Sequence, residues 1–341
     1  MEKFKSFLKR KDIEISAKRY GIDALGAMAQ GLFASLLIGT IIATLGEQLG
    51  MEVLVNIGGY AKAATGPAMA VAIGYALHCP PLVLFSLVAV GGAANTLGGA
   101  GGPLAVLLVT IVAAEFGKAV SKETKIDIIV TPFVTITIGS LLSMWCAPAI
   151  GAAASAVGAA IMWATELQPF FMGIIISVIV GIALTLPISS AAICAALSLT
   201  GLAGGAAVAG CCANMVGFAV LSFKENKWGG LFAQGIGTSM LQIPNIMKRP
   251  LIWLPPTLAS AILGPIAIIG PFHMKNNATG SGMGTSGLVG QIMTYQTMVA
   301  TESPVLVILK IVLFHFLLPG LLSYVIYRGM RNMGYIKDGQ M

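Results

Sequence analysis

The chain has 341 residues, of which 57% are hydrophobic and only 10% are charged, with a formal net charge of +7 and a mean hydropathy of +0.89. Soluble domains carry about 25% charged residues, so this composition excludes an ordinary soluble protein and indicates a membrane protein. The basic residues flank apolar runs and do not alternate with aromatic residues, which argues against a nucleic-acid partner. The five cysteines have no metal-ligand spacing, so we expect buried free thiols and neither a metal nor another cofactor.

The chain begins with a basic amphipathic lead, residues 1–20, and its first apolar run follows at 24–45. No small-residue cleavage site follows this run, so we expect an uncleaved membrane span. A helix needs roughly 20 residues to cross the hydrocarbon, and several later runs approach this length. These later runs lie at 58–78, 82–94, 103–117, 128–150, 170–186, 190–222, 251–269 and 305–327. Because 190–222 is long enough for a tight pair of crossings around Gly204 and Gly205, we predict about ten crossings.

Basic residues also gather in the connectors and in the tail, 328–341. The positive-inside rule therefore predicts that both termini are cytoplasmic. The stretch 151–168 starts with small residues in an amphipathic pattern, so we expect an interfacial helix there rather than a span.

Three segments are too rich in glycine for ordinary spans and too poor in charge for solvated loops: 91–103, 229–250 and 271–295. Non-helical backbone at membrane depth is stable only where protein buries it or where it lines a watery cavity. On the predicted topology the last two segments enter from opposite faces, as two opposing re-entrant hairpins. The sequences GGAAN at 91–95 and GGLFAQ at 229–234 occupy corresponding positions, which suggests an inverted repeat.

Uncharged polar residues in these segments are the candidate solute contacts. An amide offers two donors and two acceptor lone pairs, so a set of amides suits a neutral, hydroxyl-rich ligand. The candidate substrate-binding residues are Asn95, Asn214, Gln242, Asn245, Asn276, Asn277 and Gln291, with Thr285 and Ser286 as hydroxyl partners. The alternative is structural, because small and amide side chains also hold membrane helices together.

Four ionisable residues near apolar runs are candidates for proton or ion coupling, since an intramembrane charge is often functional: His78, Glu302, Lys310 and His315. Each has a structural alternative. His78 can satisfy the carbonyls at a helix end before Pro80, and Lys310 can pair or extend to the interface. Glu115 and Lys118, three residues apart, are expected to form a local surface pair.

Three stretches resemble the membrane-embedded IIC subunits of the sugar phosphotransferase system. They are IDIIVTPFVTITIGSLL at 126–142, IMKRPLIWLPPTLASAILGPIA at 246–267 and GSGMGTSGLVGQI at 280–292. The resemblance covers essentially the whole chain and is greatest to the stand-alone subfamily that includes perfringolysin-regulator-like proteins. Within the glucose superfamily of IIC subunits it implies an all-α polytopic fold with about ten transmembrane helices and two opposing hairpins, in a bacterial cytoplasmic membrane.

The resemblance also implies that residues 21–341 form a single transport domain with two main parts. An amino-terminal bundle at 21–150 would mediate homodimerisation, and a substrate-binding part at 169–327 would carry the hairpins. Glucose-type relatives carry a glutamate on the first hairpin that holds a sugar hydroxyl. Here that region reads SMLQIPN, without a carboxylate, and Gln242 or Ile243 takes its place.

The resulting hypothesis is a transporter of a sugar or similar polyhydroxylated solute that works by alternating access. No fused IIA or IIB module fits in the chain, so we expect no intrinsic catalysis. Phosphoryl coupling would require a separate cytoplasmic IIB partner. The alternative is a solute-sensing membrane regulatory protein that keeps the IIC fold without turnover and acts through a regulatory partner. A channel is less favoured, since the chain lacks charged rings and repeated filter motifs.

Overall fold

The computed structural model describes residues 2–337 and 339–341, with the backbone alone for residues 2–5. Residues 1 and 338, which belong to the predicted lead and tail, lie outside the described residues. The described part of the chain consists of helices and turns and has no strand, so the predicted all-helical class is confirmed.

Six helical stretches within the described residues are long and apolar enough to cross a membrane. They are Arg19–Leu49, Pro81–Val120, Asp127–Thr165, Gly201–Leu221, Pro250–Ile268 and Pro304–Asn332. A shorter apolar helix lies at Pro169–Thr185. These lengths agree with a multi-pass membrane protein, and the number of about ten crossings stays a prediction.

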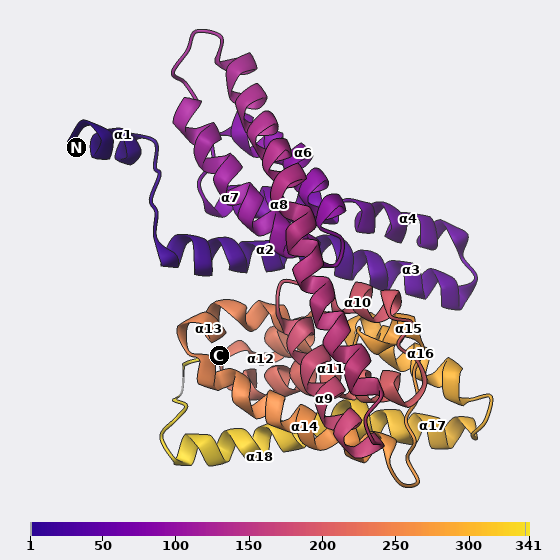
Figure 1. Ribbon diagram of the computed structural model, residues 1–341. Helices are drawn as coiled ribbons and strands as arrows, with labels where there is room; N and C mark the ends of the chain where they lie inside the picture. The colour runs from indigo at the N-terminus through magenta and orange to yellow at the C-terminus, as the bar shows by residue number, and fades with distance from the viewer. Residues whose placement is uncertain (1, 338) are drawn as a thin grey trace. The chain divides into compact units, whose positions relative to one another are not determined.

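The chain divides into two compact units, Met1–Ala153 and Ala154–Met341. The elements of the first unit, in chain order, are α1 (Glu2–Arg10), η1 (Arg19–Ala24), α2 (Leu25–Leu32), η2 (Phe33–Leu37), α3 (Ile38–Leu49), α4 (Glu52–Ala63), α5 (Thr65–Ala76), α6 (Pro81–Gly98), η3 (Gly99–Gly101), α7 (Gly102–Val120) and the first part of α8 (Asp127–Thr165). The elements from η1 to α3 form one continuous helix with two π-helical turns, and α4 returns alongside α3 (Figure 1).

The glycine-rich segment 91–103 is helical along most of its length, contrary to the expectation of irregular backbone. Helix α6 continues to Gly98, and α7 begins at Gly102. The break is a single turn at Gly99, where φ is +49°, a conformation that glycine adopts readily. Helices α6 and α7 pack side by side across this turn (Figure 1). The segment is therefore a helix–turn–helix, and the role of its Asn95 in solute binding stays a prediction.

The predicted interfacial helix at 151–168 is not a separate element. Helix α8 has 39 residues and runs without a break from Asp127 to Thr165, past two internal prolines, Pro132 and Pro148. The alanines and glycines that suggested an interfacial helix continue the same helical register. The boundary between the two units falls within this helix.

The second unit packs around one central helix, α11. Its elements after α8 are α9 (Pro169–Thr185), α10 (Ser190–Ala196), α11 (Gly201–Leu221), α12 (Phe223–Phe232), η4 (Ala233–Gly237), η5 (Ser239–Gln242), α13 (Ile243–Lys248), η6 (Pro250–Trp253), α14 (Leu254–Ile268), α15 (Ala278–Ser281), η7 (Ser286–Leu288), α16 (Val289–Met298), α17 (Pro304–Ile311), η8 (Val312–Leu317) and α18 (Leu318–Asn332). Helices α9, α14 and α18 all pack on α11, which is almost completely buried (Figure 1).

The predicted pair of crossings around Gly204 and Gly205 is wrong, because α11 passes through both glycines as one helix. The chain turns earlier, at Ser198 and Gly201, which have φ values of +49° and +64°. A β-carbon at Gly205 would collide with the carbonyl of Met274. The two glycines therefore allow α11 to approach the backbone near Met274 closely, and they do not form a turn.

Both predicted hairpin segments have broken backbone. In 229–250, the π-helical turn η4 ends at an extended Thr238 (φ −157°, ψ 142°), and the short helices η5 and α13 follow. In 271–295, Gly284, Gly287 and Leu288 have positive φ values of +54°, +54° and +59°. The two segments contact one another at η4 and η7. Their entry into the membrane from opposite faces stays a prediction.

Candidate functional site

A chain of hydrogen-bonded side chains follows the first hairpin segment. Gln234 Nε2 donates to Ser222 Oγ at 2.9 Å, Gln242 Nε2 donates to Gln234 Oε1 at 3.1 Å, and Asn245 Nδ2 donates to Gln242 Oε1 at 2.9 Å. Gln234 and Gln242 are buried, with 3% and 2% exposure, whereas Asn245 is half-buried. We call Gln234, Gln242 and Asn245 the amide chain. Its outer end is Asn245 Oδ1, for which the described residues supply no hydrogen-bond partner.

A pocket of about 310 Å³ opens beside the amide chain. All three amides line it, together with Asn226 and backbone at the glycine pair 229–230. None of the lining side chains is charged. The volume lies at the lower end of the range for small-molecule sites, and the lining can exchange hydrogen bonds with hydroxyl groups without burying a net charge.

Asn214 lies on α11 and is fully buried, but its amide is already occupied. Its Nδ2 donates to Ser260 Oγ at 3.1 Å, and its Oδ1 accepts from Trp253 Nε1 at 3.0 Å. Thr185 Oγ1 lies 3.4 Å from Asn214 Oδ1 and 2.7 Å from Ser239 Oγ. Because Ser239 and Gln242 share the short helix η5, this network positions the amide chain. Asn214 therefore supports the amide chain through these hydrogen bonds, and its contact with a solute stays a prediction.

Asn276 and Asn277 hold the second hairpin segment in shape. Asn276 pairs with Gly201 through two backbone hydrogen bonds, and its Nδ2 donates to the carbonyl of Gly290 at 3.1 Å. Asn277 caps the short helix α15, since its Oδ1 accepts from the Gly280 amide at 2.9 Å. Both side chains make hydrogen bonds that stabilise the local backbone, which agrees with the structural alternative given for these amides.

Five buried polar atoms of the second unit have no hydrogen-bond partner among the described residues: Ser286 Oγ, Gln291 Oε1, Thr294 Oγ1, His315 Nε2 and Ser323 Oγ. Gln291 Nε2 lies 3.1 Å from His315 Nδ1, which joins α16 to η8. Buried polar atoms nearly always have a hydrogen-bond partner. These unpartnered atoms therefore indicate places where water or ligand hydroxyls can bind. Ser286 belongs to η7, which contacts η4 beside the amide chain.

The chain matches the family model described as "Phosphotransferase system, EIIC" over residues 22–341. It belongs to the phosphotransferase system EIIC family. This membership confirms the resemblance noted in the sequence and identifies the chain as a membrane component of sugar transport. No curated protein and no solved structure matches the chain.

The candidate coupling residues of this EIIC protein are largely held by structural partners. Lys310 Nζ lies 2.6 Å from Glu302 Oε2 and donates to the carbonyl of Phe272 at 2.7 Å. His78 is the left-handed residue that ends α5, with φ +56°, and its exposed ring lies 3.1 Å from Asp12 Oδ2. His315 differs, because it is fully buried with one unpaired nitrogen.

Most of the predicted contacts lie in the second unit of the EIIC protein, but only Gln242 and Asn245 among them line the pocket at the amide chain. Asn95 lies in the first unit, on α6, beside Gly66 and Gly102. Thr285 Oγ1 donates to Met215 Sδ at 3.5 Å, and its contact with a solute stays a prediction. The expected pair of Glu115 and Lys118 forms at 3.1 Å, but it is buried rather than superficial.

Sequence reasoning missed several polar residues that build the site: Thr185, Ser222, Gln234, Ser239, Trp253, Thr294 and Ser260. The sequence contains one indication of Gln234, because this residue ends the GGLFAQ motif at 229–234. The others are single hydroxyl or indole groups in apolar helices or turns. Such residues usually bond to their own helix, so their position in the sequence gives no indication of a shared network.

Proposed function

We propose that this protein transports a neutral, hydroxyl-rich solute, a sugar or a similar compound, by alternating access. The observation that carries the proposal is the pocket at the amide chain, whose lining side chains are uncharged and include four amides. Ligand hydroxyls can donate to Asn245 Oδ1 and accept from the remaining amide hydrogens, and the buried network around Asn214 keeps these groups in place. Membership of the EIIC family supports a sugar as the solute class.

The proposal includes a two-part arrangement of the polar groups. The amide chain on the first hairpin segment would bind one side of the solute. Ser286 and Gln291 on the second segment, with their unpaired buried oxygens, would complete the binding site when the segments rearrange. Contact between η4 and η7 supports this coupling, since movement of one segment must affect the other. Discontinuous segments of this kind are common at transporter sites.

We further propose that the protein acts as a homodimer with both termini in the cytoplasm. The pocket side chains include no carboxylate that could activate a solute hydroxyl, which supports transport without a phosphoryl step on this chain. A separate IIB partner would be required for phosphoryl coupling. The uncharged pocket fits a membrane sensor equally well, so transport itself must be measured.

The binding proposal is tested by the thermal stability of the purified protein against sugars, sugar alcohols, sugar acids and nucleosides. A solute that binds the folded state raises its stability in proportion to the logarithm of its concentration above Kd. For a stabilising neutral solute, Asn245→Ala is expected to weaken binding about fivefold, the effect of one lost hydrogen bond of about 1 kcal/mol.

The matched control is Gln296→Ala, which removes an exposed amide on α16 outside the pocket and is expected to leave Kd unchanged. Equal affinity of the wild type and Asn245→Ala would exclude the amide chain from the site. Preference for charged sugar acids over neutral sugars would contradict the proposed solute class.

A further inference from the structure

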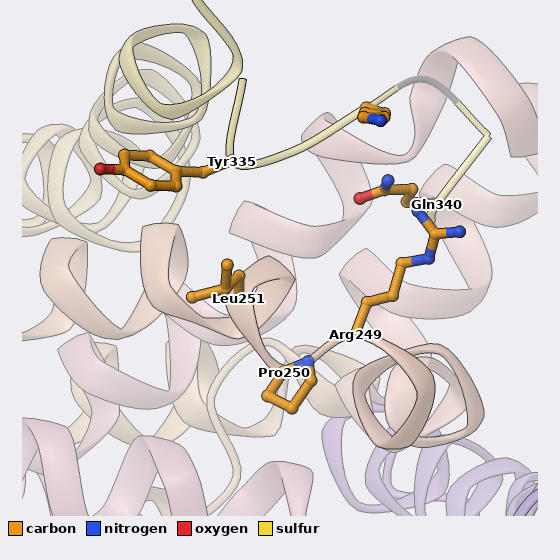
Figure 2. Close-up of a pocket in the computed structure, with 6 residues that line it drawn as sticks. Arg249, Pro250, Leu251, Tyr335 and Gln340 are labelled. Atoms are coloured by element: carbon orange, nitrogen blue, oxygen red, sulfur yellow. The ribbon is translucent and has the colours of Figure 1, made fainter. Parts of the chain in front are cut away.

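A second region of the protein combines a basic pocket with an apolar groove. The basic pocket has a volume of about 330 Å³ and is lined by Arg249, Pro250, Leu251, Tyr335, Lys337 and Gln340 (Figure 2). The apolar groove has a volume of about 480 Å³ and lies between one face of α14 and one face of α18. Leu251 and Tyr335 line both cavities, so the two are continuous.

The groove is formed by residues at helical spacing. Leu251 lies in η6, and Leu254 and Leu258 follow it on α14. The stripe on the other side consists of Ile326, Gly329 and Met330 on α18 and of Met333 directly after that helix. Spacings of three and four residues place each set on a single face of its helix. Leu254 and Leu258 are about 40% exposed, which leaves apolar surface open to a ligand.

The tail that completes the basic pocket is held in place by specific contacts. Helix α18 ends at Asn332, and the chain then turns at Gly334, with φ +81°, where the Tyr335 amide donates to the carbonyl of Met330 at 3.0 Å. Ile336 is buried, with 1% exposure. Glu225 accepts hydrogen bonds from the amides of Gly339 and Met341 at 2.6 and 2.8 Å. The pocket is therefore built by the fold.

The two cations of the pocket are not used by the fold. Neither the Arg249 guanidinium nor the Lys337 ammonium has an ion-pair or hydrogen-bond partner among the described residues, and both side chains are exposed. Arg249 directly precedes the apolar stretch Pro250–Ile268, and Lys337 lies just beyond the end of Pro304–Asn332. These positions are those of the polar interface, where Tyr335 also fits as an interfacial aromatic residue.

We propose that this pocket and groove bind an anionic phospholipid. The phosphate of the headgroup lies between Arg249 and Lys337, Gln340 donates a further hydrogen bond, and one acyl chain lies along the groove. Charge complementarity favours an anionic headgroup, since two cations without an ion-pair partner among the described residues attract the phosphate and repel the quaternary ammonium that a zwitterionic choline headgroup also carries. The continuous apolar groove requires a ligand with a hydrocarbon chain, which a soluble phosphate lacks.

The charge requirement is tested by native mass spectrometry of the full-length protein in detergent, titrated separately with phosphatidylglycerol and phosphatidylcholine. The wild type should retain phosphatidylglycerol preferentially. Arg249→Gln/Lys337→Gln is expected to weaken this binding about 25-fold, or about fivefold for each cation. The control Lys122→Gln/Lys125→Gln removes the same charge from an exposed connector of the first unit and should leave binding unchanged.

The groove requirement is tested by Gly329→Leu. A β-carbon at Gly329 meets no atom within 4 Å, so leucine can fill the groove without a clash. Each acyl methylene that it displaces should weaken phosphatidylglycerol binding about fourfold. Gly59→Leu, at an equally open glycine on α4, is the matched control and should have no effect.

Two soluble probes, glycerol 3-phosphate and inorganic phosphate, separate a lipid site from a simple anion site. Weak binding of both, with strong binding of phosphatidylglycerol, supports the proposal. Equal retention of the two lipids would overturn it. Unchanged binding in Arg249→Gln/Lys337→Gln, or binding of inorganic phosphate as tight as that of phosphatidylglycerol, would also overturn it. None of these readouts depends on the solute pocket.

Discussion

Asp12 connects the basic lead to the rest of the first unit. Its carboxylate receives two hydrogen bonds from Arg19, at 3.0 and 2.6 Å, and lies 3.1 Å from His78 Nδ1. Its backbone carbonyl accepts from Lys118 Nζ at 2.5 Å. The hydrogen bonds from Arg19 lower the pKa of Asp12 from 3.8 to about 2. A carboxylate with a lowered pKa stabilises the folded state in its ionised form.

The contacts of Asp12 should therefore respond to pH with a defined sign. They contribute fully above pH 3.8 and are lost as the pH falls through about 2. At neutral pH, Asp12→Asn should increase hydrogen exchange of residues 11–20 roughly threefold, because a half-exposed ion pair contributes only about 0.5–1 kcal/mol. Glu14→Gln, whose carboxylate lies 3.7 Å from Arg19, is the control. Equal exchange in both variants would contradict this role.

At the residue scale, the sequence indicated which amides were unusual but not what each one does. Gln242 and Asn245 reach a pocket, whereas Asn214 and Asn276 are used up by contacts with residues distant in sequence. Sequence position identifies a polar group in an apolar region. Whether its hydrogen bonds remain available depends on partners that the fold brings from other helices.

At the scale of elements, glycines decide how closely the central helices pack. A β-carbon at Gly210 on α11 would collide with the backbone of Ser177 on α9. A similar approach brings Gly264 of α14 against Gly173 of α9. Small residues at helix interfaces are the usual means of close packing in membranes. In the sequence, Gly204 and Gly205 were equally compatible with a turn, which is why the tight pair of crossings at 190–222 was predicted wrongly.

Gly210→Ala should destabilise the second unit, since the new methyl group meets backbone that cannot rotate away. Overpacking of this kind costs about 1–3 kcal/mol. Gly59→Ala on α4 has open space and should be neutral or stabilising by about 0.5–1 kcal/mol, because alanine favours a helix. Thermal unfolding in detergent distinguishes the two variants. A melting temperature for Gly210→Ala at or above that of the wild type would refute this packing account.

At the scale of the whole molecule, composition and apolar runs were sufficient to predict an all-helical membrane protein, and the EIIC family match confirms the resemblance carried by 126–142, 246–267 and 280–292. The positions of helix breaks were less predictable. Helix α8 continues beyond 150 because its small residues keep the helical register, whereas the chain breaks at Thr238 and Gly284. Breaks depend on tertiary contacts that local composition does not contain.

Counterflow in proteoliposomes measures whether this protein moves a neutral hydroxylated solute across the membrane. Vesicles loaded with an unlabelled solute that stabilises the protein should take up the labelled solute transiently, with no phosphorylated product. Asn245→Ala should reduce this uptake at low solute concentration, and Gln296→Ala should not. Specific solute binding without any counterflow would contradict transport and favour a membrane sensor.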